Sequence, residues 1–190
     1  MTRWRNTLGV GLVGLAGYSL VRRRPGVAAL AVLGATACGA PDHTSPHGLV
    51  FSLADGVEPP DWAKLDAGEN FILFYMARKL DASLADLAEA LRGVEVEIVR
   101  GDSPDGAIIG PNNDNRVPAY SRPGRGEVTL AWRGCAYRMS LVHELAHVLL
   151  FAMTDDEDSQ HQHPIWPPLD SEWRAHLGEK YLVCALDARV

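Results

Sequence analysis

The sequence predicts an α+β domain in which antiparallel strands pack on helices. Apolar residues recur at helical spacing in two early segments, 62–80 and 84–91, so we expect both to be helices. Two later segments, 94–99 and 127–132, alternate apolar with polar residues, which is the pattern of half-buried strands. Two more helices are expected after the strands. This order of elements is typical of an α+β domain.

The expected helices differ in polarity and in how they end. The first carries Leu65, Ile72 and Met76 at helical spacing, and the second ends at Gly93, a residue type that commonly stops helices. The third, over 137–152, is apolar on most sides, which predicts a position in the core. The fourth, over 170–186, is expected to close the domain.

A long loop is expected between the two strands. Residues 101–126 are rich in Gly, Pro and Asn, with one short apolar stretch at 107–109. The apolar stretch is a candidate for a short strand, and long loops within compact domains are often functional.

The first 37 residues have the pattern of an export signal. An arginine cluster, 22–24, precedes an apolar run, 26–37, that is too short for a bilayer, which needs about 20 apolar residues. Ala35-Thr36-Ala37-Cys38 resembles the lipobox of bacterial lipoproteins, which implies that Cys38 is acylated after cleavage. A second apolar stretch, 8–21, leaves two interpretations open: a start of translation near the arginines, or a twin-arginine signal.

Three parts of the chain follow from this pattern. We expect a lipoprotein-type signal peptide over 1–37, a flexible tether rich in Gly, Pro, Asp and Ser over 38–60, and the folded domain over 61–190. A lipid-anchored protein of this kind would be exported and held at the bacterial cell envelope.

The charge distribution excludes several classes of partner. The formal net charge is −6, and five of the 18 basic residues but none of the 24 acidic ones lie within 1–37, so the domain itself is strongly acidic. We expect no nucleic-acid binding, because phosphate binding needs clustered Lys and Arg. Membrane attachment is expected through the N-terminal lipid only, and the chain is expected to be a monomer.

The other two cysteines are candidates for a disulfide. Outside the cytoplasm Cys135 and Cys184 would be oxidised if they lie close together. Such a bridge would close a loop of about 50 residues and add roughly 4 kcal/mol of stability. Two separately buried thiols are the alternative.

The most informative motif is His143-Glu144-Leu145-Ala146-His147 on the expected apolar helix. Two histidines four positions apart point the same way, with β-carbons about 5–6 Å apart, so both imidazoles can reach one Zn²⁺ ion. Glu144 follows the first histidine directly, where its carboxylate can take a proton from a water on the metal. The motif and its uncharged surroundings resemble those of the zincin metallopeptidases, which implies a small zincin-like domain with this helix at its active site.

A zinc peptidase needs a third protein ligand. An acidic run followed by His161, Pro164 and Trp166 is similar to a group of bacterial zincin-like proteins, and this resemblance implies that His161 completes the site. His163 is an alternative. Glu172 is another, because Glu172-Trp173-Arg174-Ala175 resembles the Glu-x-x-Ala element of the thermolysin-like gluzincins.

These features together predict zinc-dependent hydrolysis of peptide or protein substrates by an envelope lipoprotein. By analogy with zincins, the strand over 127–132 would pair with an extended substrate. Candidates for stabilising the transition-state oxyanion are Tyr120, Tyr137, Arg174 and His176. Two other functions stay open: a non-catalytic zinc-binding lipoprotein, and a structural or interaction lipoprotein without a metal.

Overall fold

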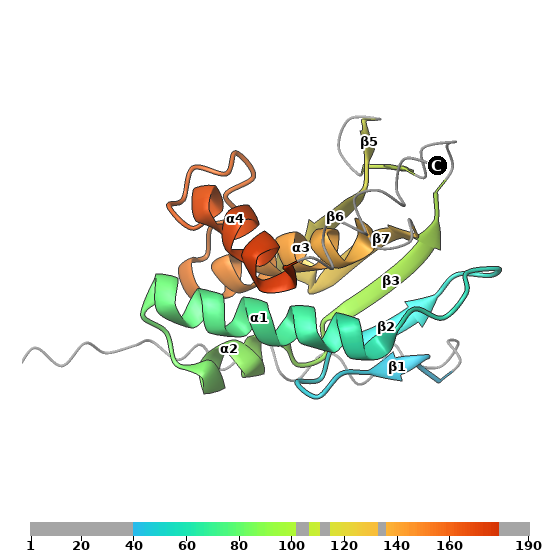
Figure 1. The fold of residues 1–190 in the computed structure, drawn as a ribbon, viewed down its shortest axis with the longest axis horizontal. Helices are drawn as coiled ribbons and strands as arrows, with labels where there is room; N and C mark the ends of the chain where they lie inside the picture. The colour runs from blue at the N-terminus through green and yellow to red at the C-terminus, as the bar shows by residue number, and fades with distance from the viewer. Residues whose placement is uncertain (1–39, 102–106, 111–114, 133–135, 179–190) are drawn as a thin grey trace, which may run out of the picture. The chain divides into compact units, whose positions relative to one another are not determined.

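The computed structural model describes residues 40–101, 107–110, 115–132 and 136–178, and for residues 136–139 it describes the backbone alone (Figure 1). The expected signal peptide, 1–37, and the acylated Cys38 lie outside the described residues. The expected disulfide also lies outside them, because neither Cys135 nor Cys184 is described. The predictions for these residues therefore stay predictions.

The described residues form one mixed sheet of five strands in the order β1-β2-β3-β7-β6. The strands are β1 (His43–Thr44), β2 (Val50–Leu53), β3 (Glu95–Arg100), β6 (Ala119–Arg122) and β7 (Glu127–Trp132). The central pairs, β2–β3 and β3–β7, are parallel, and the outer pairs, β1–β2 and β6–β7, are antiparallel. A separate two-stranded ladder joins β4 (Ile108–Ile109) to β5 (Arg116–Val117).

The expectation of an antiparallel sheet is wrong for the two central strand pairs. Alternating polarity shows that a strand has one buried face, but it carries no information on strand direction. Direction depends on the connections, and two helices lie between β2 and β3 while a long segment lies between β3 and β7. Both connections are long enough for the crossover that parallel pairing requires.

Four helices are present in the described part of the chain, which confirms the α+β class. They are α1 (Trp62–Leu80), α2 (Leu84–Leu91), α3 (Ala136–Thr154) and α4 (Trp166–Leu177), together with the short 3-10 turn η1 (Pro123–Arg125). α4 begins before its predicted start because two prolines occupy its first turn, where a missing N–H costs no helical hydrogen bond. None of the helices within the described residues combines the length and hydropathy that a membrane span requires.

The helices cover one face of the sheet. Phe51, Val96 and Val128 lie side by side on adjacent strands and are buried, whereas Ser52 and Glu97, one position further along, are exposed. On the buried side α3 contacts β6 and β7, and α1 runs alongside α3 (Figure 1). The central helix α3 is thus enclosed between the sheet and α1, which explains why it is apolar on most sides.

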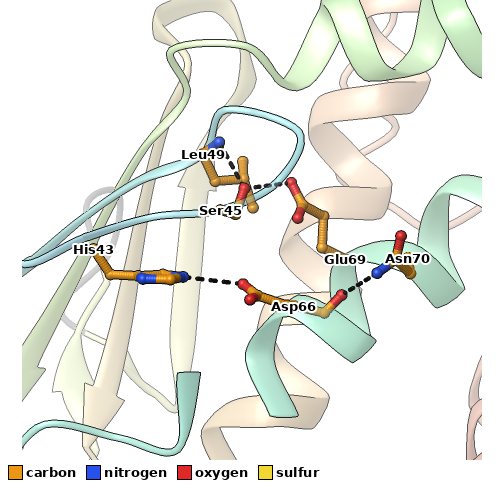
Figure 2. A network of polar contacts seen from close by, with 6 residues as sticks. All are labelled: His43, Ser45, Leu49, Asp66, Glu69 and Asn70. Atoms are coloured by element: carbon orange, nitrogen blue, oxygen red, sulfur yellow. Dashed lines mark hydrogen bonds and ion pairs between the residues drawn. The ribbon is translucent and has the colours of Figure 1, made fainter. Parts of the chain in front are cut away.

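The expected flexible tether needs a correction at its centre. Residues 43–53 form β1, β2 and the turn between them, and Leu49 and Phe51 are fully buried in the core. The polar residues of this segment carry its contacts to α1 (Figure 2). Ser45 Oγ donates to Glu69 Oε1 at 2.8 Å and accepts the N–H of Leu49 at 2.9 Å. A segment with no helical or long strand pattern can therefore be ordered by a few buried apolar side chains together with side-chain hydrogen bonds.

Candidate metal centre

The histidine pair lies on α3, at the place where this helix faces a cavity. His143 and His147 are one helical turn apart, and Leu141, Leu145 and Leu149 are fully buried on the same helix. Burial of these leucines fixes the rotation of α3 about its axis. Because that rotation is fixed, both imidazoles are presented on the same side.

A third imidazole meets this pair. His161 Nε2 lies 3.0 Å from His143 Nε2 and 3.1 Å from His147 Nε2. Three nitrogens that are each about 2.0–2.1 Å from a tetrahedral zinc ion are about 3.3 Å apart, so the observed spacing is close to that of a metal site. The three residues form a group that could hold a metal ion. The structure thus brings together the two helical histidines and the third ligand implied by the family resemblance.

The second nitrogen of His147 fixes its tautomer. His147 Nδ1 lies 3.0 Å from the backbone oxygen of Glu157. A carbonyl oxygen only accepts, so Nδ1 carries the proton and Nε2 keeps a free lone pair. Metal-binding histidines are commonly oriented by such a hydrogen bond on the opposite nitrogen.

Burial keeps the helical imidazoles neutral. It lowers the pKa of His143 to about 4, with further lowering by the neighbouring His147 and His161. Burial also lowers the pKa of His147. Neutral imidazole is the form that binds metals, so at pH 7 both side chains are ready to act as ligands.

Asp158 shapes the loop that carries the third histidine. Its carboxylate accepts the backbone N–H groups of Gln162 and His163, each at 2.8 Å, and the indole N–H of Trp166. The Trp166 ring lies against all three imidazoles, with centroid distances of 4.4 to 5.1 Å. The loop therefore holds His161 through one carboxylate and one indole. His161 itself adopts a left-handed backbone conformation, with φ of 54°.

The far end of this loop is fixed to α1 by a buried hydrogen bond. The hydroxyl of Tyr75 donates to the backbone oxygen of Ile165, and both residues are buried. We expect Tyr75→Phe to reduce the free energy of unfolding by about 0.5–1.5 kcal/mol, because it removes a hydrogen bond between two buried residues. Urea denaturation of the chelator-treated protein measures this. Tyr120→Phe is the matched control, since Tyr120 is a half-buried residue whose hydroxyl has no hydrogen bond among the described residues; equal losses in both variants would contradict the prediction.

Glu144 lines the same cavity as the imidazoles and is largely buried. Its side chain is 8% exposed, and burial raises its pKa to about 7. Ser121 Oγ donates to Glu144 Oε2 at 2.7 Å, which partly offsets this effect by stabilising the carboxylate. A carboxyl group with a pKa near neutrality is suited to accept and return protons. The sequence did not predict this role of Ser121, because none of the residues next to it in the chain indicates a contact with α3.

Removing this hydroxyl is expected to raise the pKa of Glu144 above its value of about 7 by roughly one pH unit. The sign follows because a donor to the carboxylate stabilises the charged form, and Ser121→Ala removes that donor. Titration of the Glu144 carboxyl carbon by NMR in the metal-free protein measures the shift. Ser52→Ala, an exposed serine on β2, should leave it unchanged. An unchanged or lowered pKa in S121A would refute the role given to Ser121.

The two alternative ligands lie in other contacts. Nδ1 of His163 accepts the backbone N–H of Ile165 at 3.3 Å. The carboxylate of Glu172 forms ion pairs with Arg78 and Lys79 on α1. Among the described residues neither belongs to the group that could hold a metal.

Of the candidates for oxyanion stabilisation, Tyr120 is among the residues that line the cavity beside the imidazoles, and the others are engaged elsewhere or not described. Arg174 pairs with Asp170 at 2.8 Å, and the ring of His176 stacks on Trp173. Tyr120 lies under the guanidinium of Arg122, on the sheet face opposite to Ser121. The side chain of Tyr137 lies outside the described residues.

A cavity of about 750 Å³ opens beside the imidazoles. One wall is β6 with the residues before it, and the other is formed by α4 and the loop that carries His161. The expectation that the strand over 127–132 borders the site needs correction, because β7 is paired on both sides by β3 and β6. Sequence adjacency to the motif helix suggested β7, but β6 forms the edge of the sheet.

Among the described strands β6 is the last of the sheet, and its outer edge presents backbone groups to this cavity. The N–H of Ala131 donates to the backbone oxygen of Pro118 at 2.9 Å, which sets the alternation along the antiparallel pair. Tyr120 therefore points its N–H and C=O at β7, whereas Ala119 and Ser121 point theirs away from β7. Both of these residues line the cavity.

The site thus combines three convergent imidazoles, one buried carboxylate and one strand edge that no described strand pairs with, around a single cavity. Such a set can hold a metal ion, move a proton and align an extended chain. Comparisons of this chain with family models, with curated proteins and with solved structures find no match.

Proposed function

We propose that this protein is a zinc-dependent peptidase. The observation that carries the proposal is the approach of His161 Nε2 to within 3.0–3.1 Å of both helical imidazoles, beside the buried carboxyl group of Glu144. A metal site alone would need only the imidazoles. A buried carboxyl group at its side, facing a cavity, is the additional feature that hydrolysis requires.

Zinc is the metal that fits the donor set best. Three neutral imidazole nitrogens from His143, His147 and His161 suit a borderline-soft ion, and three protein ligands leave a fourth position open, as in catalytic zinc sites. When bound there, zinc would lower the pKa of a water molecule and polarise a carbonyl group.

Glu144 would serve as the general base. Its carboxylate accepts a proton from the attacking water as the water oxygen bonds to the carbonyl carbon. It then returns that proton to the amide nitrogen as the carbon–nitrogen bond breaks, so that the products are a carboxylic acid and an amine. Ser121 Oγ, 2.7 Å from Glu144 Oε2, holds the carboxylate in place during both transfers.

The substrate would lie along β6. An extended peptide can add to a free strand edge through backbone hydrogen bonds, which gives affinity without a defined sequence. Ala119 and Ser121 offer their N–H and C=O groups on this edge, next to the imidazoles. This geometry favours peptides and unfolded segments over compact substrates.

Export and lipid anchoring remain part of the proposal on sequence grounds. The arginine cluster, the short apolar run and Ala35-Thr36-Ala37-Cys38 support a lipoprotein signal. We propose that the peptidase acts at the cell envelope, attached through Cys38.

Metal content and peptide hydrolysis test the proposal directly. The purified chain is expected to carry about one zinc per molecule, to digest unfolded casein, to lose this activity with a chelator and to regain it with added zinc. Bound zinc without hydrolysis of any peptide tested would instead support a non-catalytic zinc-binding protein. Failure to bind any divalent metal would refute the proposal and favour a structural or interaction role.

A further inference from the structure

The cavity beside the imidazoles has charge of one sign. Its charged lining residues, Glu144, Glu157 and Asp170, are all acidic, and no Lys or Arg occurs among the described residues that line it. Most of the remaining wall is apolar, including Leu169 and Trp173 of α4. Apart from the metal ion proposed at the imidazoles, a ligand of this cavity would therefore meet only negatively charged and uncharged side chains.

The three carboxylates are not equivalent. Glu144 accepts the hydroxyl of Ser121, and Asp170 is paired with Arg174 at 2.8 Å. The carboxylate of Glu157, in contrast, has no hydrogen bond or ion pair with any side chain in the described part of the chain, and the residue is exposed. Glu157 is thus the carboxylate that can accept a positively charged partner from outside.

The backbone of Glu157 is fixed next to the imidazoles. Its carbonyl accepts the Nδ1 proton of His147 at 3.0 Å, and the following residue, Asp158, organises the loop through its contacts with Gln162, His163 and Trp166. The side chain of Glu157 therefore starts from a defined position near the centre of the site. Since Glu157 also lines the cavity, a substrate bound beside the imidazoles would place the side chains next to its cleaved bond close to this residue.

We propose that Glu157 selects peptides with a lysine or arginine within two residues of the cleaved bond. This inference rests on the proposed peptidase function and names its substrate class: cationic, extended peptide segments. A partly exposed charge pair is modest in energy, so a preference of about threefold to tenfold in kcat/KM over a neutral residue is expected. The preference should weaken as salt is added, because screening acts on exposed charges.

The cleavage test uses sets of three peptides that differ at a single position, which carries Lys, Ala or Glu. One set is made for each of the four positions nearest the scissile bond. The zinc-loaded wild type is expected to prefer Lys over Ala over Glu at one of these positions. Glu157→Gln should flatten the order, and Glu157→Lys should reverse it. Glu89→Gln is the matched control, because Glu89 is an exposed glutamate on α2 that pairs with Arg92, and it should keep the wild-type order.

A binding test separates this inference from the proposed function. Three fluorescent peptides, with positive, zero and negative net charge, are titrated with zinc-loaded protein that carries Glu144→Gln, either alone or together with Glu157→Gln. Fluorescence anisotropy gives the affinity of each peptide. Tighter binding of the cationic peptide that is lost with E157Q supports the inference even if the wild type cleaves nothing, which would refute peptidase activity alone. Equal affinities, or a charge preference that survives E157Q, would overturn the role of Glu157 while leaving any observed cleavage intact.

Discussion

Replacing Glu144 with glutamine is expected to lower kcat for peptide hydrolysis by about 10²–10⁴-fold, the usual contribution of a general base. Glutamine has nearly the same shape, and its side-chain oxygen can still accept the Ser121 hydroxyl, which lies 2.7 Å from the carboxylate. An amide, however, cannot accept a proton from water. Initial rates with a saturating fluorogenic peptide give kcat, and zinc content measured on the same sample should be unchanged, since Glu144 does not belong to the group of potential ligands.

The chain contains a closely matched control for this substitution. Glu69 is also buried, its pKa is also raised by burial, and it also accepts a serine hydroxyl, that of Ser45 at 2.8 Å (Figure 2). It differs from Glu144 in its contacts, which join α1 to the turn between β1 and β2. Glu69→Gln should therefore leave kcat within about twofold. Retention of most activity in E144Q, or an equal loss in E69Q, would show that buried carboxyl groups here serve stability and not catalysis.

The motif helix could be predicted well because its signals are local. The spacing of His143 and His147 places both on one side of any helix, and the apolar residues around them show that this helix is buried. α1 and α2 were predicted with the observed bounds for the same reason. In each case the 3.6-residue period can be read within a single segment.

Features that depend on contacts between distant segments could not be predicted. Ser121 lies in a four-residue strand within a segment expected to be a loop. Its role at the site depends on the hydrogen bond that it donates to Glu144 across the sheet–helix interface. The parallel pairing of β3 with β7 has no pattern in either strand. β1 and β2 are short, and polar contacts such as Ser45 with Glu69 order the turn between them, so composition alone suggested a tether.

The third ligand falls between these two cases. The chain offered His161, His163 and Glu172, all beyond α3, and only a family resemblance favoured the first. What distinguishes His161 in the structure is the loop conformation, held by Asp158 and Trp166. The conformation of a loop leaves no periodic pattern in the sequence, so the sequence alone could not distinguish His161 from His163 and Glu172.

Replacing His161 with alanine is expected to weaken zinc binding by about 10²–10⁴-fold, since a zinc-binding free energy of about 10–16 kcal/mol is shared among three or four ligands. Competition with a fluorescent chelator measures the dissociation constant. His163→Ala is the matched control: it lies in the same loop, and its ring accepts only the N–H of Ile165 at 3.3 Å, so it should change zinc affinity by less than about tenfold. Glu172→Gln removes the ion pairs with Arg78 and Lys79 and should likewise spare zinc affinity. If either control loses as much zinc affinity as H161A, the third ligand would have to be reassigned to that residue. Such a result would mean that the structure rearranges on metal binding.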